Sequence, residues 1–317
     1  MWVEILLFIC FCVLLSYSAT LLVKSLVKIS KWLKISEYLV GFILMALATS
    51  LPELFVGIQA SLRGTPVLSL GNVLGSNIAD ICLVGSIIIL LARGIKIKSK
   101  QIKKDSLWML LLSALPIVLF FVGNCLSRID GFILLGTWLL YFRHLLREAK
   151  KRKKPYEENK GKPWEPVVYS ALFVIAFLLL LFSAEWVIKY ANKISALLNL
   201  NPLLVGIFFI AIGTSLPELV FESRAIMLKH KELALGDLLG SVITNSTLVL
   251  GLTALIMPIY ANFFYFLLSS LFMFIMVFLW VTFIESESKL GIKEGIALLL
   301  LYIFFIIVEF YLRGLIS

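Results

Sequence analysis

A carboxylate ends an Ala-x-x-Thr-Ser-Leu-Pro-Glu motif that occurs twice in this chain, each time inside a strongly apolar segment. The first copy runs from Ala46 to Glu53 and the second from Ala211 to Glu218. A charged side chain at the centre of a bilayer costs about 2.5–3.5 kcal/mol even on insertion scales, so acids in such segments usually mark an ion pathway. Both copies therefore point to a cation site within a membrane.

The backbone around the first copy is predicted to break. Pro52 cannot donate a hydrogen bond to the carbonyl four residues earlier, and Ser50 with Glu53 matches a capping box, which marks a helix start. Carbonyls freed near Ala46–Thr49 would join the threonine hydroxyl and Glu53 as hard oxygen ligands, of which Ca²⁺ takes about 6–8. A plain proline kink would explain one copy, but not why both copies place a glutamate beside it.

A second motif, Leu-Gly-x-x-x-Gly-Ser, also occurs twice. The first copy continues to Asp80 and the second to Asn245. Its glycines are four residues apart, which lets helices approach closely. Ser76 and Asp80 are also four apart and share a helix face, as do Ser241 and Asn245. The motif therefore predicts a hydroxyl and a carboxylate or amide presented at a tight helix contact.

Equivalent residues of the two halves are always 165 positions apart. The related pairs are Ala46 and Ala211, Thr49 and Thr214, Glu53 and Glu218, Ser76 and Ser241, and Asp80 and Asn245. The predicted centre holds three carboxylates and one amide, whose charge the bilayer would not tolerate uncompensated. It should always hold a divalent cation, several monovalent cations or protons, and this competition is the basis of an antiporter.

The composition indicates an integral membrane protein. Hydrophobic residues make up 61% of the 317 residues and charged residues 15%, well below the quarter typical of soluble domains. A spanning helix needs about 20 mostly apolar residues, which predicts ten all-α spans. They lie near 2–21, 38–60, 67–92, 106–124, 131–147, 167–188, 201–226, 233–257, 261–283 and 293–312.

The two halves are predicted to form inverted repeats. Residues 1–150 hold five spans with the motifs at 41–80, residues 151–165 form a basic linker, and residues 166–317 hold five spans with the motifs at 206–245. Because five is odd, the second repeat enters the membrane in the opposite sense, which brings equivalent helices together near the midplane. Spans 2 and 7 would be the broken helices.

Basic residues predict the orientation in the cell membrane. In the ten-span arrangement, 24 of the 29 Lys and Arg fall on one side, which the positive-inside rule assigns to the cytoplasm. Both termini would then lie outside and the 147–166 loop inside. The basic stretch 147–162 is interpreted as a topology-setting linker that also contacts anionic lipid. Neither nucleic acid nor an obligatory protein partner is expected.

The motifs resemble those of the sodium/calcium exchanger family, in its short prokaryotic form. The matching signatures are Gly-x(4)-Ala-x-(Gly/Ala)-Thr-Ser-Leu-Pro-Glu and Leu-Gly-(Asn/Asp)-x-x-Gly-Ser. The resemblance implies no cofactor and two transported ions. Matched by position, Ca²⁺ would be held by Glu53, Glu218, Thr49 and Thr214, outer Na⁺ sites by Ala46, Ser76, Ala211 and Ser241, and a middle site by Asp80 and Asn245.

The chain departs from the family pattern at several acids. Asp80 and Asn245 reverse the expected order of amide and acid. Glu222 and Asp237 have no counterpart acids in the first repeat; they are expected to be solvated at the cytoplasmic side, or else to lie on an entrance path. Glu185 is expected to pair with Lys189, four residues away. Together with Glu309, it is left out of the site.

Four functions are weighed. The first is an electrogenic Na⁺/Ca²⁺ antiporter with alternating access, in which spans 1 and 6 slide against a core. The second is an H⁺-coupled Ca²⁺ or cation antiporter on the same fold, which would have no need of the serine hydroxyls. The internal duplication argues against a channel, and the paired hydroxyls have no use in an intramembrane enzyme.

Overall fold

The computed structural model is almost entirely helical and describes residues 2–32, 45–97, 100–151, 164–197, 214–227, 229 and 231–314. Helices of the first repeat are α1 (Trp2–Trp32), α2 (Met45–Thr49), α3 (Leu51–Leu62), α4 (Val67–Ile78), the π-helix η2 (Ala79–Val84), α5 (Gly85–Leu91), α6 (Lys100–Gly123) and α7 (Arg128–Lys151). The strand β1 (Ile95–Lys96) lies between α5 and α6.

The second repeat follows the same order. Its helices are α8 (Glu165–Leu197), α11 (Leu216–Met227), α12 (Lys231–Thr244), the π-helix η4 (Asn245–Val249), α13 (Leu250–Ile256), α14 (Phe263–Glu287) and α15 (Ile292–Gly314), with β2 (Lys289–Leu290) before α15. Six helical runs of the described residues are long and apolar enough to cross a membrane. They are Val67–Leu91, Lys100–Gly123, Arg128–Arg147, Val167–Ser195, Ala234–Ile256 and Phe263–Ser286. The number of spans stays a prediction.

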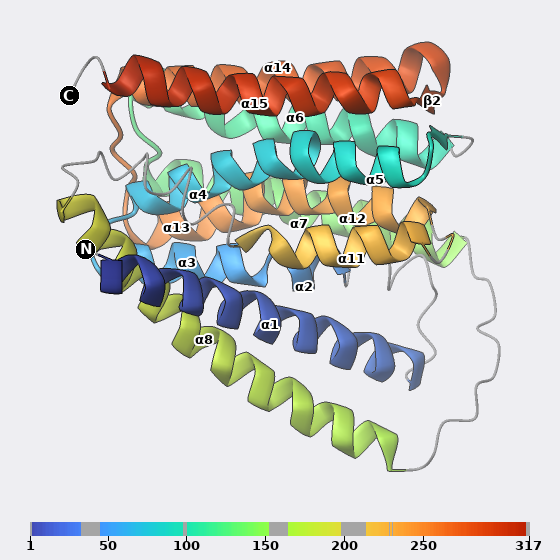
Figure 1. Ribbon diagram of the computed structural model, residues 1–317, viewed down its shortest axis with the longest axis horizontal. Helices are drawn as coiled ribbons and strands as arrows, with labels where there is room; N and C mark the ends of the chain where they lie inside the picture. Colours follow the sequence, from blue (N-terminus) through green and yellow to red (C-terminus); the bar gives the residue numbers. More distant parts are fainter. Residues whose placement is uncertain are drawn as a thin grey trace.

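The repeats run in opposite directions. In Figure 1, α1 runs away from the labelled N-terminus while its counterpart α8 runs back toward it, and α14 and α6 are likewise opposed. Strands β1 and β2 pair antiparallel, with Ile95 opposite Leu290. At the other end of the helices, Leu126 and Ile259 exchange two backbone hydrogen bonds of 3.0 and 2.9 Å. Each contact joins non-equivalent loops of the two repeats, and the 165-residue offset relates one contact to the other to within one residue, as the two-fold axis of an inverted repeat requires.

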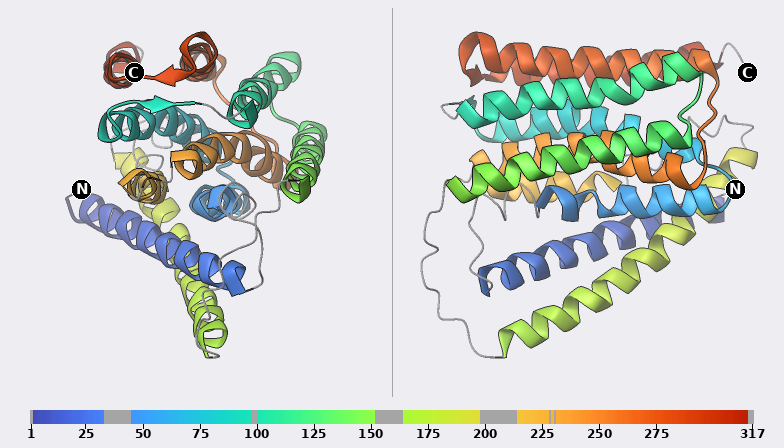
Figure 2. Two further views of the ribbon diagram at one scale, coloured as in Figure 1. Left: turned by 90° about the vertical axis from the view of Figure 1, so that its right-hand side faces the viewer. Right: turned by 180° about the vertical axis from the view of Figure 1, so that it is seen from behind.

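Two hydrophobic cores hold the helices together. The larger one joins α4 to α7 with α12 to α15, around Trp280, Phe120 and Phe266. The smaller one joins α1, α8 and α3, and there Phe11 stacks on Trp186 with ring centroids 5.3 Å apart. Figure 2 shows α1 and α8 together on one side of the remaining helices. The α1–α8 pair is thus packed separately from most of the molecule.

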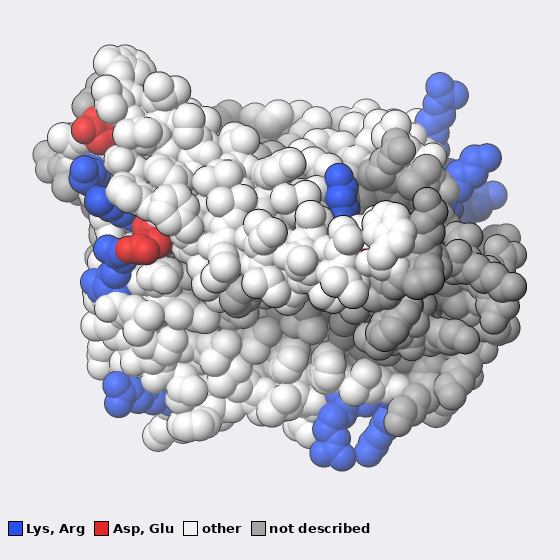
Figure 3. Space-filling model, turned by 90° about the horizontal axis from the view of Figure 1, so that it is seen from below, with Lys and Arg blue, Asp and Glu red and all other residues white. Residues whose placement is uncertain are grey.

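The surface has the polarity expected for a membrane span. In Figure 3, charged side chains gather mostly toward the two ends of the face that carries α1 and α8, and a wide uncharged face lies between them. Large apolar side chains are exposed along the helices, among them Val13, Val122 and Leu300. Lipid chains, rather than water, suit such a surface.

The predicted partner of Glu185 is wrong. Glu185 pairs with Arg63, with Nη2 and Oε1 2.5 Å apart, while Lys189 lies over the ring of Trp186, with its ammonium 3.9 Å from the centroid. Arg63 follows the end of α3, which packs along α8, so a tertiary contact replaces the local i,i+4 pair.

Candidate cation site

The first half of the site is a hydroxyl network around Thr49, at the end of α2. Its Oγ1 lies 3.2 Å from Oγ of Ser241 on α12, and 3.2 Å from the Asp237 carboxylate, to which it donates. All three side chains are fully or almost fully buried. Two hydroxyl oxygens and a carboxylate from opposite repeats thus meet at one point.

The second half repeats this network with the roles of the repeats exchanged. Oγ1 of Thr214, just before α11, lies 3.3 Å from Oγ of Ser76 on α4 and 3.1 Å from Oδ1 of Asn72. These three residues lie 165 positions from their counterparts in the first half-site, which are Thr49, Ser241 and Asp237. The two half-sites are therefore related by the internal two-fold, and they differ in carrying Asp237 in one and the amide Asn72 in the other.

Glu53 belongs to the second half-site. Its Oε1 accepts a hydrogen bond from Ser76 of 3.1 Å, and its side chain is fully buried. The predicted capping box is wrong, since Ser50 makes no side-chain capping bond. Glu53 is turned toward α4 and is free to present its other oxygen, Oε2, which has no hydrogen-bond partner in the described part of the chain.

Glu218 is equally buried, but neither of its carboxylate oxygens accepts a hydrogen bond from a described residue. A buried ionised group without a partner is costly, and such groups normally pair or bind a metal. An incoming cation would supply the missing partner.

Asp80 and Asn245 both lie in π-helical turns, which the sequence did not predict. Asp80 is the second residue of η2 and Asn245 the first of η4. Both side chains are fully buried, with no hydrogen-bond partner by geometry among the described residues. π-turns are rare and occur often at functional sites. Their presence at equivalent positions of both repeats supports a shared role for these two residues.

The structure also corrects the preferred interpretation of Glu222 and Asp237. Instead of being solvated, both side chains are completely buried. Asp237 contributes to the first half-site through Thr49, and Glu222 lies one turn beyond Glu218 on α11. Hydropathy had placed them near a membrane surface, whereas the packing of α11 against α12 and α5 encloses them.

Five fully buried carboxylates lie on the packed helices α3, η2, α11 and α12 and are referred to as the cluster. Its members are Glu53, Asp80, Glu218, Glu222 and Asp237. Within the described residues, none of the five forms an ion pair with a Lys or Arg, and no three acidic, His or Cys side chains converge on one point. Cation ligands here would combine carboxylates with hydroxyl, amide and carbonyl oxygens.

Ala46 and Ala211 are the least supported of the predicted ligands. The Ala46 carbonyl accepts the N–H of Ser50 at 3.1 Å, so it keeps a helical hydrogen bond, and the interruption between α2 and α3 is confined to Ser50. Ser215 occupies the equivalent turn position. Ala211 lies outside the described residues, so the break in its helix stays a prediction.

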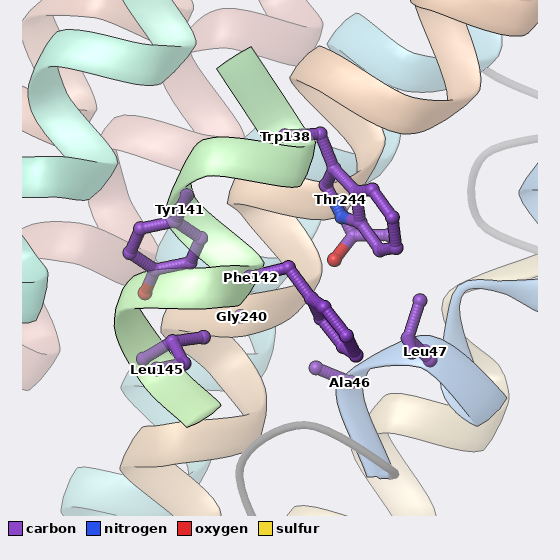
Figure 4. Close-up of a pocket in the computed structure, with 8 residues that line it drawn as sticks. All are labelled: Ala46, Leu47, Trp138, Tyr141, Phe142, Leu145, Gly240 and Thr244. Carbon is purple, nitrogen blue, oxygen red and sulfur yellow. The ribbon is translucent and has the colours of Figure 1, made fainter. Parts of the chain in front are cut away.

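A small pocket adjoins Ala46 on the outer side of the site. Its wall includes three aromatic side chains of α7, and Figure 4 shows Phe142 pointing toward Ala46 on α2. The lining residues are Ala46, Leu47, Trp138, Tyr141, Phe142, Leu145, Gly240 and Thr244. Its volume of about 20 Å³ is room for a single water. Two of its lining residues, Gly240 and Thr244, directly precede Ser241 and Asn245 in the sequence.

Two further buried polar contacts lie apart from these networks. Ser269 of α14 donates to Glu309 of α15 over 2.6 Å, which agrees with leaving Glu309 out of the site. Asn77 donates to Ser246 of η4 over 2.8 Å and was missed, because its counterpart in the second motif is the apolar Val242.

Comparison with known proteins decides the family. The sequence pattern of the sodium/calcium exchanger proteins matches residues 3–146 and, a second time, residues 168–311. The chain belongs to the sodium/calcium exchanger family. Its members are secondary transporters of cations across membranes and not enzymes, and the ions are their substrates.

Individual relatives agree with this assignment. The chain is 27% identical to the sodium/calcium exchanger MaX1 of Methanosarcina acetivorans, over 92% of this chain and 93% of that protein. It is 32% identical to the inner membrane protein YrbG of Escherichia coli, over 77% of each. Its structure is similar to that of the exchanger NCX_Mj soaked with Na⁺ and Ca²⁺, with a TM-score of 0.70, 28% identity and coverage of 96% and 97%.

Proposed function

We propose that this exchanger moves Ca²⁺ in one direction and Na⁺ in the other through the cluster between the two repeats. The observation that carries the proposal is the pair of two-fold-related networks, Thr49 with Ser241 and Thr214 with Ser76. Hydroxyl oxygens are ligands for Na⁺, whereas a carboxylate takes up a proton without needing them. The relatives MaX1 and NCX_Mj are named sodium/calcium exchangers, which supports the same ions here.

Within this proposal, Ca²⁺ binds at the centre of the cluster. Glu53 and Glu218 supply the charge, and Thr49 and Thr214 supply neutral oxygens. The outer Na⁺ sites use Ala46, Ser76, Ala211 and Ser241, and a middle site uses Asp80 and Asn245. Because several Na⁺ replace one Ca²⁺ in overlapping positions, the two loads carry unequal charge and exchange is electrogenic.

Alternating access would come from motion of the α1–α8 pair. These helices belong to the smaller hydrophobic core, which they share with α3, and α1 also contacts α2 and α11, which carry ligands. Sliding of the pair across this surface would open the cluster to one side at a time, as in other inverted-repeat transporters. The termini are proposed to lie outside and the 147–166 loop in the cytoplasm, against anionic lipid.

The test is ⁴⁵Ca²⁺ uptake into proteoliposomes loaded with Na⁺ and diluted into Na⁺-free buffer. Uptake that needs the Na⁺ gradient, and that increases with an inside-positive potential as Na⁺ leaves, is the expected result. A pH gradient applied without Na⁺ tests the second candidate, H⁺ coupling, for which the five buried carboxylates provide proton acceptors. Uptake driven by that gradient alone would replace Na⁺ with H⁺ as the coupling ion.

A further inference from the structure

The hydrogen bond between Asn77 and Ser246 crosses from one repeat to the other outside the two threonine networks. The amide nitrogen of Asn77, near the end of α4, donates to Oγ of Ser246 in η4 over 2.8 Å and to Sδ of Met273 on α14 over 3.4 Å. Asn77 and Ser246 are completely buried and Met273 is almost so. Because a thioether sulfur can only accept a hydrogen bond, it fixes the amide with its nitrogen toward Ser246.

Both ends of this bond lie beside the π-turns. Asn77 comes three residues before Asp80, the second residue of η2. Ser246 directly follows Asn245, the first residue of η4, and α4 packs against η4. The bond therefore joins the two segments that carry Asp80 and Asn245.

The register of each π-turn decides where its polar side chain points. A change of one residue in a helix turns the side chains beyond it by about 100° around the helix axis, since a turn contains about 3.6 residues. π-turns are rare within α-helices, so we expect contacts from neighbouring helices to stabilise these two. A direct hydrogen bond between the segments is a contact of that kind.

The position related to this bond by the internal two-fold is apolar. The residues 165 positions from Asn77 and Ser246 are Val242 and Ile81, both fully buried in the larger core. The fold thus accepts apolar side chains at the equivalent position. Replacing both partners of a buried hydrogen bond by apolar groups can be nearly neutral for stability. Direction, rather than stability, is therefore what the Asn77–Ser246 bond adds.

We propose that Asn77 is a positioning residue of the cation site, whose bond to Ser246 sets the register of the two π-turns and thereby the placement of Asp80 and Asn245. Asn77 acts through these two side chains and is not itself a ligand. The inference rests on the proposed function, in which Asp80 and Asn245 bind Na⁺ while Ca²⁺ is held by the glutamates and threonines. Loss of the bond should therefore weaken Na⁺ binding more than Ca²⁺ binding.

The experiment is equilibrium binding of ⁴⁵Ca²⁺ to the purified full-length protein, followed by its displacement with increasing Na⁺. Asn77→Val and Ser246→Ala are each expected to raise the Na⁺ concentration that displaces half of the Ca²⁺ by about fivefold, the effect of one net hydrogen bond. The dissociation constant for Ca²⁺ should change by less than about twofold. The double variant should lose no more than either single variant, because both changes remove the same bond.

Ser113→Ala is the matched control. It removes a fully buried hydroxyl that bonds within its own helix, to the Leu110 carbonyl of α6, and it should behave as wild type. If Asn77→Val does not fold, Ser246→Ala answers the same question, since it removes the acceptor by the loss of one oxygen.

Unchanged displacement by Na⁺ in the variants, or equal weakening of both ions, would overturn the inference, and so would additive losses in the double variant. Such results with normal displacement in the wild type reject the positioning role alone. A wild type whose bound Ca²⁺ does not respond to Na⁺ would instead reject the proposed function, and this inference with it. Binding is measured without a gradient, so the outcome does not depend on the transport assay.

Discussion

Glu53 and Glu218 occupy equivalent positions but have different neighbours. Glu53 accepts a bond from Ser76, whereas Glu218 has no hydrogen-bond partner in the described residues. Glu218 thus depends more on a bound cation for its compensation. This difference suggests that the empty site is least stable around α11.

Glu53→Gln and Glu218→Gln are each predicted to abolish Ca²⁺ uptake while the protein still folds. Loss of an interaction with a charged group costs about 1.5–3 kcal/mol, which is about 10- to 150-fold in Ca²⁺ affinity. Uptake of ⁴⁵Ca²⁺ and the elution profile in detergent measure the two effects. Normal uptake by either variant would remove that glutamate from the site. Glu309→Gln should behave as wild type, because Glu309 bonds with Ser269 outside the two networks.

Asp80→Asn is predicted to weaken Na⁺ coupling more than Ca²⁺ binding, because Asp80 belongs to the proposed middle Na⁺ site. The Na⁺ concentration for half-maximal exchange should rise about tenfold, the effect of about 1.4 kcal/mol, with a smaller change for Ca²⁺. Combining it with Asn245→Asp exchanges the two side chains and should restore coupling. Equal losses for both ions would contradict the middle-site role.

The motifs predicted which side chains meet, but only partly how they are bonded. Thr49, Ser76, Thr214 and Ser241 come together as the repeat requires. Burial of Asp237 and Glu222 was not predictable from hydropathy, since it depends on helices distant in sequence: α5 packs against α11, and α2 and α6 pack against α12. The predicted ion pair of Glu185 with Lys189 was wrong for the same reason, because the actual partner, Arg63, comes from another helix.

At the scale of helices, close backbone contact is most evident between α7 and α13. A Cβ on Gly131 would lie 2.8 Å from the carbonyl oxygen of Gly251 and 2.9 Å from the backbone N of Leu255. Both neighbours are backbone atoms, which cannot rotate away. Gly136 lies in the same helix, with nothing within 4 Å of the corresponding position.

Gly131→Ala is therefore predicted to destabilise the protein by about 1–3 kcal/mol, the usual cost of overpacking. Gly136→Ala should be neutral or stabilising by up to about 1 kcal/mol, since alanine favours the helix. Thermal unfolding of both variants in the same detergent measures the difference. Equal melting temperatures would show that α7 and α13 adjust their separation freely.

The π-turns at Asp80 and Asn245 had no recognisable signal in the sequence. Both surrounding segments read as continuous apolar helices, and a one-residue widening changes neither composition nor hydropathy. Only the duplicated polar residue at each turn could have drawn attention to these positions. Pro52 predicted a break in the helix, whereas the structure shows a turn at Ser50 alone between α2 and α3, so a broken membrane helix stays a prediction.

For the molecule as a whole, equivalent loops of the two repeats lie at opposite ends. Lys231 donates to the Gly94 carbonyl over 3.3 Å at the same end as the β1–β2 pair, while Leu126 and Ile259 meet at the other. The sequence predicted that the second repeat is inverted relative to the first, because each repeat was expected to contain five spans, which is an odd number. Which end faces the cytoplasm was predicted from basic residues alone.

Cysteine labelling of intact cells tests that orientation. In a chain without its four native cysteines, Tyr260→Cys is predicted to react with an impermeant maleimide from outside, since Tyr260 is 72% exposed. Lys289→Cys, exposed at the opposite end, should react only after the cells are permeabilised. The reverse pattern would invert the proposed topology while leaving the fold unchanged.

Each of the threonine contacts described above crosses from one repeat to the other. Thr49 meets Ser241 and Asp237, and Thr214 meets Ser76 and Asn72. A single repeat thus contains only half of each threonine network, although the contact of Ser76 with Glu53 lies within one repeat. It follows that an ancestral gene of one repeat could have built this cluster only as two copies inserted in opposite orientations. Fusion of those copies then let the acids of the two halves diverge independently.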